Sequence, residues 1–243
     1  MLLIDSHVHI YDCYDYLNVF NVASKNASEN AKRFGLVKYD TALLLTENQN
    51  QNFFSKIKNA DNQADEMKVG DWNIVQTSEA MSIVLINSIS GERVFVLAGR
   101  QVVTKEGIEV SALLTDDIFP DGEPISETLT AIQSKNGIPA LPWGAGKWLG
   151  KRGRLVSSLI KTRGNIFLSD NGSRPKLWPY PCQFKQAEMK NIKVLAGSDP
   201  LPIPGDETRI GSFGFILNGD IDDKEPGRWL FSSLTKLISS PEF

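Results

Sequence analysis

The sequence predicts an α/β fold in which a mainly parallel sheet closes into a barrel, and three observations support this prediction. Apolar runs typical of buried strands alternate with segments of helical periodicity along most of the chain. The length of 243 residues suits one α/β barrel domain over residues 1–243. A strand is expected near each end of the pattern, so that the first and last strands can lie side by side in a closed sheet.

Local signals mark the expected elements. Leu2-Leu3-Ile4 is a short apolar run typical of a buried strand, and Gly35 is well placed to end a helix over residues 19–34. Further strands are expected at residues 41–46, 138–141, 166–169 and 194–197. Further helices are expected at residues 126–135, 152–161, 182–190 and 226–238.

Residues 72–115 depart from this alternation. Strand-like runs occur there at residues 74–76, 82–87, 93–97 and 108–114. Two of the segments between them, Ser90-Gly91-Glu92 and Lys105-Glu106-Gly107, are typical of tight turns, which favours hairpins over helical crossovers. The sequence therefore predicts a barrel with a hairpin-rich insertion around residues 72–115.

Charge and cysteine content narrow the class of protein. The net charge is -3, so nucleic acid is not an expected partner. Two cysteines form no disulfide framework, and residues 1–10 lack the pattern of a secretion signal, so a cytoplasmic protein is expected. The apolar runs are too short to span a bilayer, so a membrane is not an expected partner either. No feature indicates an oligomeric state.

The first strand leads into His7-Val8-His9, which contains the only histidines of the chain. Alternate residues of a strand share a face, so both imidazoles are expected to point the same way. Two neutral imidazoles that converge on one point suit Zn, Mn or Fe. The alternative is that both rings only form hydrogen bonds at the mouth of the barrel. The use of both histidines in one pair favours the metal site.

Asp199 is the best carboxylate candidate for the same site. It follows the last predicted strand of the alternating pattern, and the first and last strands of a closed barrel are neighbours. The alternative for Asp199 is a turn or capping role before Pro200. Asp5 precedes the histidine pair by two residues, and we expect it to accept a hydrogen bond from an imidazole N–H.

Several short motifs follow one another along the chain. Asp5-Ser6-His7-Val8-His9 comes first, Thr46-Glu47-Asn48 and Gly99-Arg100-Gln101 follow, and Gly197-Ser198-Asp199 comes last. In this order they resemble the Asp-x-His-x-His, Thr-Asp-His, Gly-x-Glu and Gly-Ser-Asp motifs of the polymerase-and-histidinol-phosphatase family. The resemblance spans residues 2–199 and implies a distorted (β/α)7 TIM-like barrel with metal-dependent phosphoester hydrolysis.

Departures from the family pattern lower the expected number of metal ions. Asn48 stands where the family has a histidine, Gln101 stands where it has a glutamate, and the later family histidines are absent. A multi-metal cluster needs many anionic and imidazole donors to offset the repulsion between cations. We therefore expect one divalent ion (Zn, Mn or Fe) rather than three, held by His7, His9 and Asp199. A site without metal is the alternative.

Two further carboxylates are the catalytic candidates. Glu47 follows the second predicted strand and is also a candidate fourth ligand. Asp170 follows the strand at 166–169, where it is a candidate ligand, general base or simple turn residue.

Basic residues that follow predicted strands are candidate groups for binding the substrate. They are Arg100, Lys147, Arg174 and Arg209. Gly144 and Gly146 flank the loop of Lys147 and allow the backbone to approach a ligand closely. Solvated surface charge is the alternative for this loop. A small anionic molecule, carrying phosphate or carboxylate, is the expected partner.

Three functions follow from these observations. The leading one is a metal-dependent hydrolase acting on a small anionic substrate, a phosphate ester. The missing ligands leave open a catalytically inactive barrel that binds a small anion. The His-x-His motif and Asp199 also fit an amidohydrolase that cleaves C–N bonds, although that superfamily uses further histidines that this chain lacks.

Overall fold

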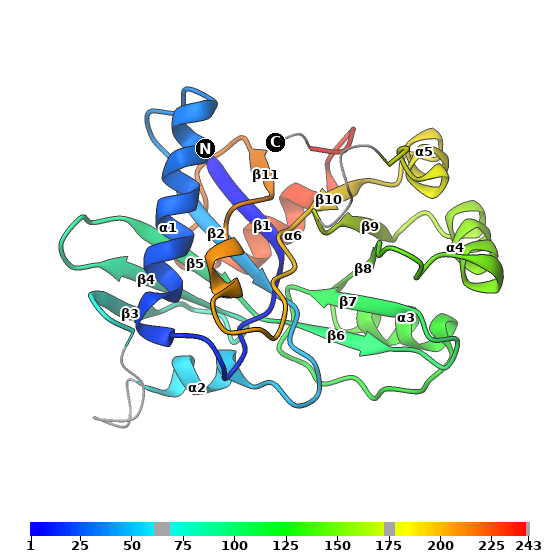
Figure 1. Cartoon of the computed structure of the whole chain (residues 1–243), viewed down its shortest axis with the longest axis horizontal. Coiled ribbons are helices and arrows are strands. Elements are labelled where there is room, and N and C mark those ends of the chain that lie inside the picture. The colour runs from blue at the N-terminus through cyan, green and yellow to red at the C-terminus, as the bar shows by residue number, and fades with distance from the viewer. Residues whose placement is uncertain (61–68, 173–177, 242–243) are drawn as a thin grey trace.

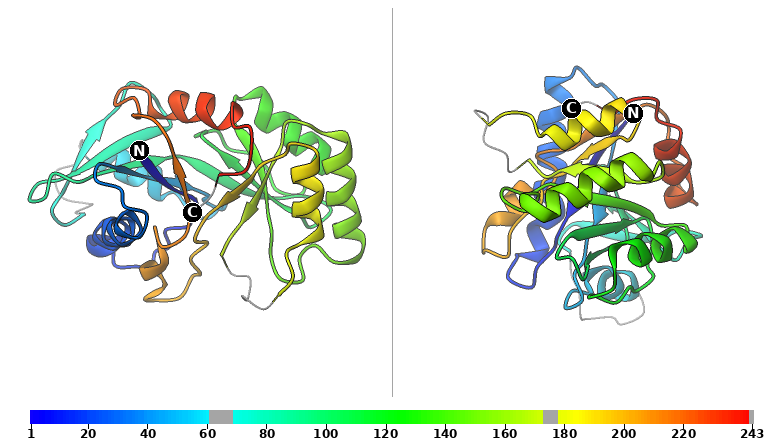
Figure 2. Two further views of the ribbon diagram at one scale, coloured as in Figure 1. Left: turned by 90° about the horizontal axis from the view of Figure 1, so that it is seen from above. Right: turned by 90° about the vertical axis from the view of Figure 1, so that its right-hand side faces the viewer.

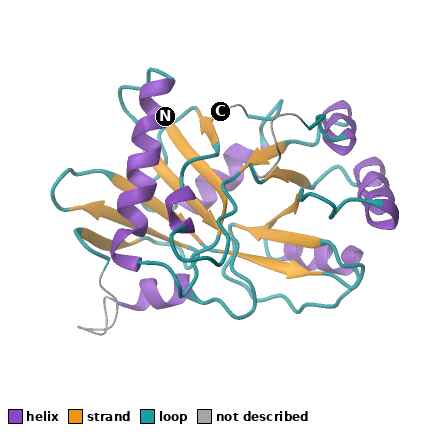
Figure 3. Cartoon of the chain, in the orientation of Figure 1, coloured by secondary structure: helices purple, strands orange, loops and turns teal. Residues whose placement is uncertain are grey.

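The computed structural model describes residues 1–60, 69–172 and 178–241. The strands gather in the middle of the molecule and the helices lie around them (Figure 3). The strands form two separate mixed sheets, of six and five strands. The protein is thus an α/β fold, as the sequence predicts.

The six-stranded sheet has the strand order β11-β1-β2-β5-β4-β3. Its members are β1 (Leu2–Val8), β2 (Asp40–Leu45), β3 (Trp72–Gln76), β4 (Ser82–Asn87), β5 (Arg93–Leu97) and β11 (Phe215–Leu217). β2 is parallel to both β1 and β5, whereas β4 is antiparallel to β5 and β3, and β11 is antiparallel to β1.

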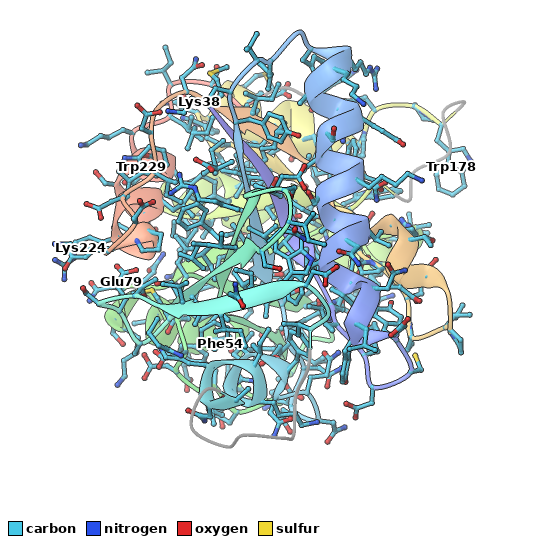
Figure 4. The ribbon with its side chains drawn as sticks, turned by 90° about the vertical axis from the view of Figure 1, so that its left-hand side faces the viewer. Lys38, Phe54, Glu79, Trp178, Lys224 and Trp229 are labelled. Carbon is cyan, nitrogen blue, oxygen red and sulfur yellow. The ribbon has the colours of Figure 1, made fainter. Side chains whose placement is uncertain are left out.

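The five-stranded sheet has the order β10-β9-β8-β7-β6. Its members are β6 (Gly99–Val103), β7 (Glu109–Leu113), β8 (Ile138–Pro142), β9 (Phe167–Asp170) and β10 (Val194–Ala196). β8, β9 and β10 are parallel, and β7 is antiparallel to β6 and β8. Beyond β9 the chain reaches Trp178, which projects from the body of the molecule and is 49% exposed (Figure 4).

Helices cover the outer faces of the sheets. They are α1 (Tyr16–Arg33), α2 (Phe53–Asn59), α3 (Ile125–Ser134), α4 (Gly150–Thr162), α5 (Cys182–Met189), α6 (Pro226–Thr235) and the 3-10 turn η2 (Asp206–Arg209). α1 and α6 lie on opposite faces of the six-stranded sheet, and α4 and α5 line the outer side of the five-stranded sheet (Figures 1 and 2). None of the helices in the described part of the chain is long and apolar enough to cross a membrane.

Side chains alternate between the two faces of β2, so the six-stranded sheet contributes to two hydrophobic clusters. Leu43 faces α1 and belongs to the same cluster as Phe20, whereas Leu44 faces α6 and belongs to the same cluster as Leu230. The second cluster also contains Leu195 of β10, so this core joins the two sheets. All five side chains are fully buried, and burying each one contributes about 1.5–3 kcal/mol.

The closed barrel predicted from the sequence is wrong. β1 already has β2 on one edge and the antiparallel β11 on the other, so β10 finds no free edge on which to complete a ladder. An isolated bridge between Glu47 and Arg100 links the ends of β2 and β6. Within the described ranges no further ladder joins the sheets, and the distorted (β/α)7 TIM-like arrangement is absent.

The insertion proposed for residues 72–115 is wrong for the same reason. The strands of this segment do pair as hairpins, but they are members of the two sheets and not an insertion into a barrel. β5 pairs in parallel with β2 and extends the first sheet through β4 and β3, while β6 and β7 begin the second sheet. The sequence pattern gives no sign of α2, β6 or β11. The last two are short, with five and three residues, and β6 contains Gly99-Arg100-Gln101, where no apolar alternation marks a strand.

Candidate metal centre

Three side chains from the two halves of the chain meet where β1 and β10 end. His7 Nε2 lies 3.5 Å from Asp199 Oδ1, and His9 Nε2 lies 3.7 Å from the same oxygen. The two Nε2 atoms are 3.2 Å apart. The two histidines are almost fully buried, whereas the Asp199 side chain is 19% exposed, so the carboxylate is the part of the cluster nearest to solvent.

The spacing of these atoms fits the ligand shell of one small cation. Four ligands at about 2.0–2.1 Å from a zinc ion, arranged tetrahedrally, lie about 3.3 Å from one another. The three observed separations, 3.2, 3.5 and 3.7 Å, are close to that value. In the part of the chain that the structure describes, no other histidine, cysteine, aspartate or glutamate joins this cluster. The three residues can therefore hold one metal ion, and further positions would fall to other donors.

The chain after β10 is held tightly against β1. Ser6 Oγ donates to the carbonyl of Ala196 at 2.8 Å, and the backbone N–H of Asp199 donates to the carbonyl of His7 at 2.9 Å. Only glycine fits between them, because a Cβ on Gly197 would lie 2.4 Å from His7 N. Asp199 has a φ of +45°, a left-handed conformation that non-glycine residues seldom adopt and that is enriched at functional sites.

Asp5 anchors the backbone on both sides of this junction. Its carboxylate accepts hydrogen bonds from Ser198 Oγ at 2.6 Å, Ser198 N at 2.8 Å, Gly211 N at 2.8 Å and His7 N at 3.3 Å. Burial raises the pKa of Asp5 to about 6, and the hydrogen bonds from Ser198 and Gly211 oppose that rise. The expected bond from an imidazole N–H is not among these contacts, so Asp5 positions the ligands through their backbone.

Burial also sets the charge of the two imidazoles. It lowers the pKa of His7 and of His9, and the neighbouring ring lowers the pKa of His9 further. The charge of Asp199 opposes both effects, as do the side chains of Gln101 beside His7 and Gln51 beside His9. With lowered pKa values both rings are neutral near pH 7, so each can offer a nitrogen lone pair to a cation.

The Nδ1 nitrogens of the two rings lack the hydrogen-bond partners that are usual for metal-binding histidines. Nδ1 of His7 and Nδ1 of His9 are buried, and neither forms a hydrogen bond with a described residue. Metal-binding histidines usually donate this second N–H to a carbonyl or carboxylate. A buried polar nitrogen without a partner lowers the stability of the folded protein by about 1–3 kcal/mol.

Asn171 holds the third ligand in place. Its Nδ2 donates to Asp199 Oδ2 at 2.7 Å, which leaves Oδ1 directed at the two rings. No motif of the sequence indicates this role for Asn171, although it lies next to Asp170 in a Ser-Asp-Asn-Gly turn at the end of a strand. Hydrogen bonds of this kind orient a carboxylate ligand and tune its affinity for metal.

Glu47, a candidate catalytic residue, lies outside the cluster. Its Oε1 accepts from the backbone of Phe54 at the start of α2 at 2.8 Å, and its Oε2 pairs with Arg100 Nη1 at 3.0 Å. Burial raises the pKa of Glu47, and the Phe54 N–H and Arg100 oppose that rise. The Glu47 carboxylate thus links β2 to α2 and β6. Arg100 forms the β6 side of this link through its ion pair with Glu47.

Asp170, Lys147 and Arg209 do not join the cluster of ligand atoms. Asp170 ends β9, and its Oδ1 accepts from Gly172 N at 3.2 Å, as in a turn. Lys147 pairs with Glu109 at 2.5 Å, and both charges act on His7. Arg209 donates to the carbonyl of Ser198 at 2.8 Å and pairs loosely with Asp206. Arg174 lies outside the described residues.

Comparison with known proteins informs the fold. No protein-family model and no curated protein matches the chain. The structure is similar to that of PsfC from Pseudomonas syringae PB-5123, with a TM-score of 0.56 over 95% of this chain and 87% of PsfC. The sequence identity is 15%, so the similarity shows a shared fold and nothing about activity.

Proposed function

We propose that the resemblance to the polymerase-and-histidinol-phosphatase motifs extends to chemistry, and that this protein is a metal-dependent hydrolase of a small phosphate ester. The observation that carries the proposal is the convergence of His7, His9 and Asp199, with ligand atoms 3.2 to 3.7 Å apart. The metal would be a single Zn, Mn or Fe ion, since imidazole nitrogen and carboxylate oxygen suit all three.

The charge of the cluster supports an anionic substrate. Two neutral imidazoles and one carboxylate contribute a charge of about -1, so a divalent ion would leave the centre with a charge of about +1. Lys147 lies close enough to lower the pKa of both histidines, but it pairs with Glu109, so this pair adds no net charge to the centre. A phosphate ester would neutralise this excess, whereas a neutral substrate would not.

The roles of the protein groups follow from their contacts. A divalent ion bound here supplies a positive charge that polarises a phosphoryl oxygen and lowers the pKa of water. His7 and His9 hold their lone pairs in place because both rings are buried. Asn171 fixes the Asp199 carboxylate, and Arg209 holds the carbonyl of Ser198 immediately before it. Lys147 is half exposed, so its Nζ can leave Glu109 and reach an incoming phosphate.

Asp170 is the proposed proton acceptor. It ends β9 next to Asn171, whose side chain contacts the ligand Asp199. Glu47 is less suited to this step because its carboxylate is buried between the start of α2 and Arg100. The assignment predicts that Asp170→Asn lowers kcat by at least about 100-fold, the usual range for general acid–base groups, without loss of bound metal.

The test combines metal analysis with activity. Purified protein is freed of metal with a chelator, then supplied with Zn²⁺, Mn²⁺ or Fe²⁺, and hydrolysis of 4-nitrophenyl phosphate is measured. The proposal expects one equivalent of bound metal and activity that returns only with metal. Loaded protein that hydrolyses none of a broad panel of phosphate esters would contradict it.

A second candidate function, binding of a small anion without catalysis, has its own support. The 3.2 Å contact between the two Nε2 atoms also fits a hydrogen bond between one protonated and one unprotonated ring nitrogen. Glu47 and Asp170 each have an oxygen that caps a backbone N–H, at Phe54 and Gly172 respectively. This candidate expects inorganic phosphate to raise the melting temperature of the protein equally with and without chelator.

A further inference from the structure

A cavity of about 460 Å³ lies where β2 and β6 meet, and the residues that line it do not include His7, His9 or Asp199. Gln51 and Gln101 line it, and the same two side chains lie beside His9 and His7. A volume of this size is typical of pockets for small molecules. A substrate that reacts at the cluster can therefore extend into this cavity.

Arg100 presents a partly unused guanidinium to the cavity. Its Nη1 donates to Glu47 Oε2 at 3.0 Å and to the carbonyl of Gln51 at 3.0 Å. Nε and Nη2 form no hydrogen bond with a described residue, although the side chain is only 15% exposed. These two atoms carry parallel N–H groups on one edge of the planar guanidinium, and the spacing of the two groups matches both oxygens of a carboxylate.

Glu47 keeps this edge fixed. The pair with Glu47 and the bond to Gln51 hold the guanidinium from one side, so its other edge is presented without loss of side-chain entropy on binding. The lining of the cavity also contains Phe119, which is buried, and the exposed residues Ile118 and Pro120. The cavity thus offers one cationic edge next to an apolar surface.

We infer that this cavity recognises a carboxylate on the part of the substrate that does not react, so that the substrate is a phosphate ester with a carboxylate on an apolar or aromatic stem. The inference rests on the proposed function only for the phosphate ester. The carboxylate subsite is defined by Arg100, Gln101 and Phe119 and needs no metal.

The experiment compares two probes that differ in one group. Binding of 4-carboxyphenyl phosphate and 4-carbamoylphenyl phosphate is measured by calorimetry on the full chain in chelator, which removes catalysis. The same titrations are made on Arg100→Lys, which keeps the charge beside Glu47 but loses the second edge of the guanidinium. Arg154→Lys is the matched control, since Arg154 is exposed on α4. Melting temperatures establish that both variants are folded.

We expect the carboxylate probe to bind the unmodified protein at least tenfold more tightly than the carboxamide probe. Arg100→Lys should remove this preference, and Arg154→Lys should preserve it. Equal affinity for the two probes, or a preference that survives in Arg100→Lys, would overturn the inference. The two proposals fail separately: the preference without hydrolysis in metal-loaded protein contradicts the proposed function alone, and hydrolysis without the preference contradicts the carboxylate subsite alone.

Discussion

The two sheets approach each other at the β1–β10 and the β2–β6 junctions, and these junctions use their charged residues in opposite ways. At the β1–β10 junction, Asp199 turns one carboxylate oxygen toward two imidazole nitrogens and leaves it without a cationic partner in the described chain. At the β2–β6 junction, Glu47 is satisfied by Arg100 and by the N–H of Phe54. The same residue type at the end of a strand is a candidate ligand in one place and a structural tie in the other.

The difference shows what separates a binding site from a structural contact. Both carboxylates follow strands, and both belong to motifs that resemble one family. At the first junction the carboxylate is left for a ligand to pair with, whereas at the second the protein pairs the carboxylate with its own arginine, and only the guanidinium edge away from Glu47 is left for a ligand. Variants can break each junction separately, and the expected effects differ in kind as well as in size.

The largest effect is expected from breaking the structural junction. Arg100→Ala leaves Glu47 charged and buried without its partner, which should lower the free energy of unfolding by about 3 kcal/mol. Chemical denaturation measures this value. Lys147→Ala removes a half-exposed partner of Glu109 and should cost less than about 1 kcal/mol. Equal losses in the two variants would show that the β2–β6 pair is not a structural tie.

The next effect is expected at the candidate metal centre. His9→Ala removes one of three ligands and should weaken metal binding by at least about 100-fold, beyond the usual cost of losing an outer hydrogen bond. Competition with a chromogenic chelator measures the affinity. Asp12→Asn is the control, because Asp12 is close in sequence but its side chain is 82% exposed. Metal binding that is unchanged in His9→Ala would place the ion elsewhere.

A smaller effect is expected from the packing between β10 and β1. Gly197→Ala places a Cβ 2.4 Å from His7 N, so the two segments must move apart. We expect a loss of about 2 kcal/mol in the free energy of unfolding and weaker metal binding. Gly164→Ala serves as the control, since a Cβ there meets no atom within 4 Å. A stable Gly197→Ala protein with full metal affinity would contradict the close approach seen at His7.

The smallest effect is expected from the residue that orients Asp199. Asn171→Ala removes the 2.7 Å hydrogen bond to Oδ2 but keeps every ligand atom. Metal affinity should fall by about tenfold, at the lower end of the range for such supporting contacts. The same chelator competition measures it, with the melting temperature of the metal-free protein as the control for folding. A loss as large as that of His9→Ala would identify Asn171 as a ligand itself.

The ligand residues could be predicted from the sequence because strong local rules apply to them. Strand alternation places His7 and His9 on one face, and the scarcity of histidine singles them out. Asp199 was expected beside them from a closed barrel. The proximity is observed, but it arises from the contact of Asp199 N with the carbonyl of His7 at the edge between two open sheets.

The rest depended on contacts between residues far apart in the sequence. Arg100 pairs with Glu47, which lies 53 positions away in the sequence, and no local sequence pattern predicts that pairing. The barrel prediction failed because β11 has only three residues, too few for a periodic signal, yet it occupies the edge of β1 that closure would need. Pairing partners of strands are decided by the whole fold, and an alternating pattern specifies only their faces.

We expect His7, His9 and Asp199 to bind one metal ion together. Anomalous diffraction from crystals grown with Zn²⁺ or Mn²⁺ tests it most directly, with data collected on both sides of the absorption edge of the metal. The account predicts a single strong peak about 2.0–2.2 Å from Nε2 of His7, Nε2 of His9 and Oδ1 of Asp199. A peak elsewhere, or no peak between these atoms at saturating metal, would contradict it.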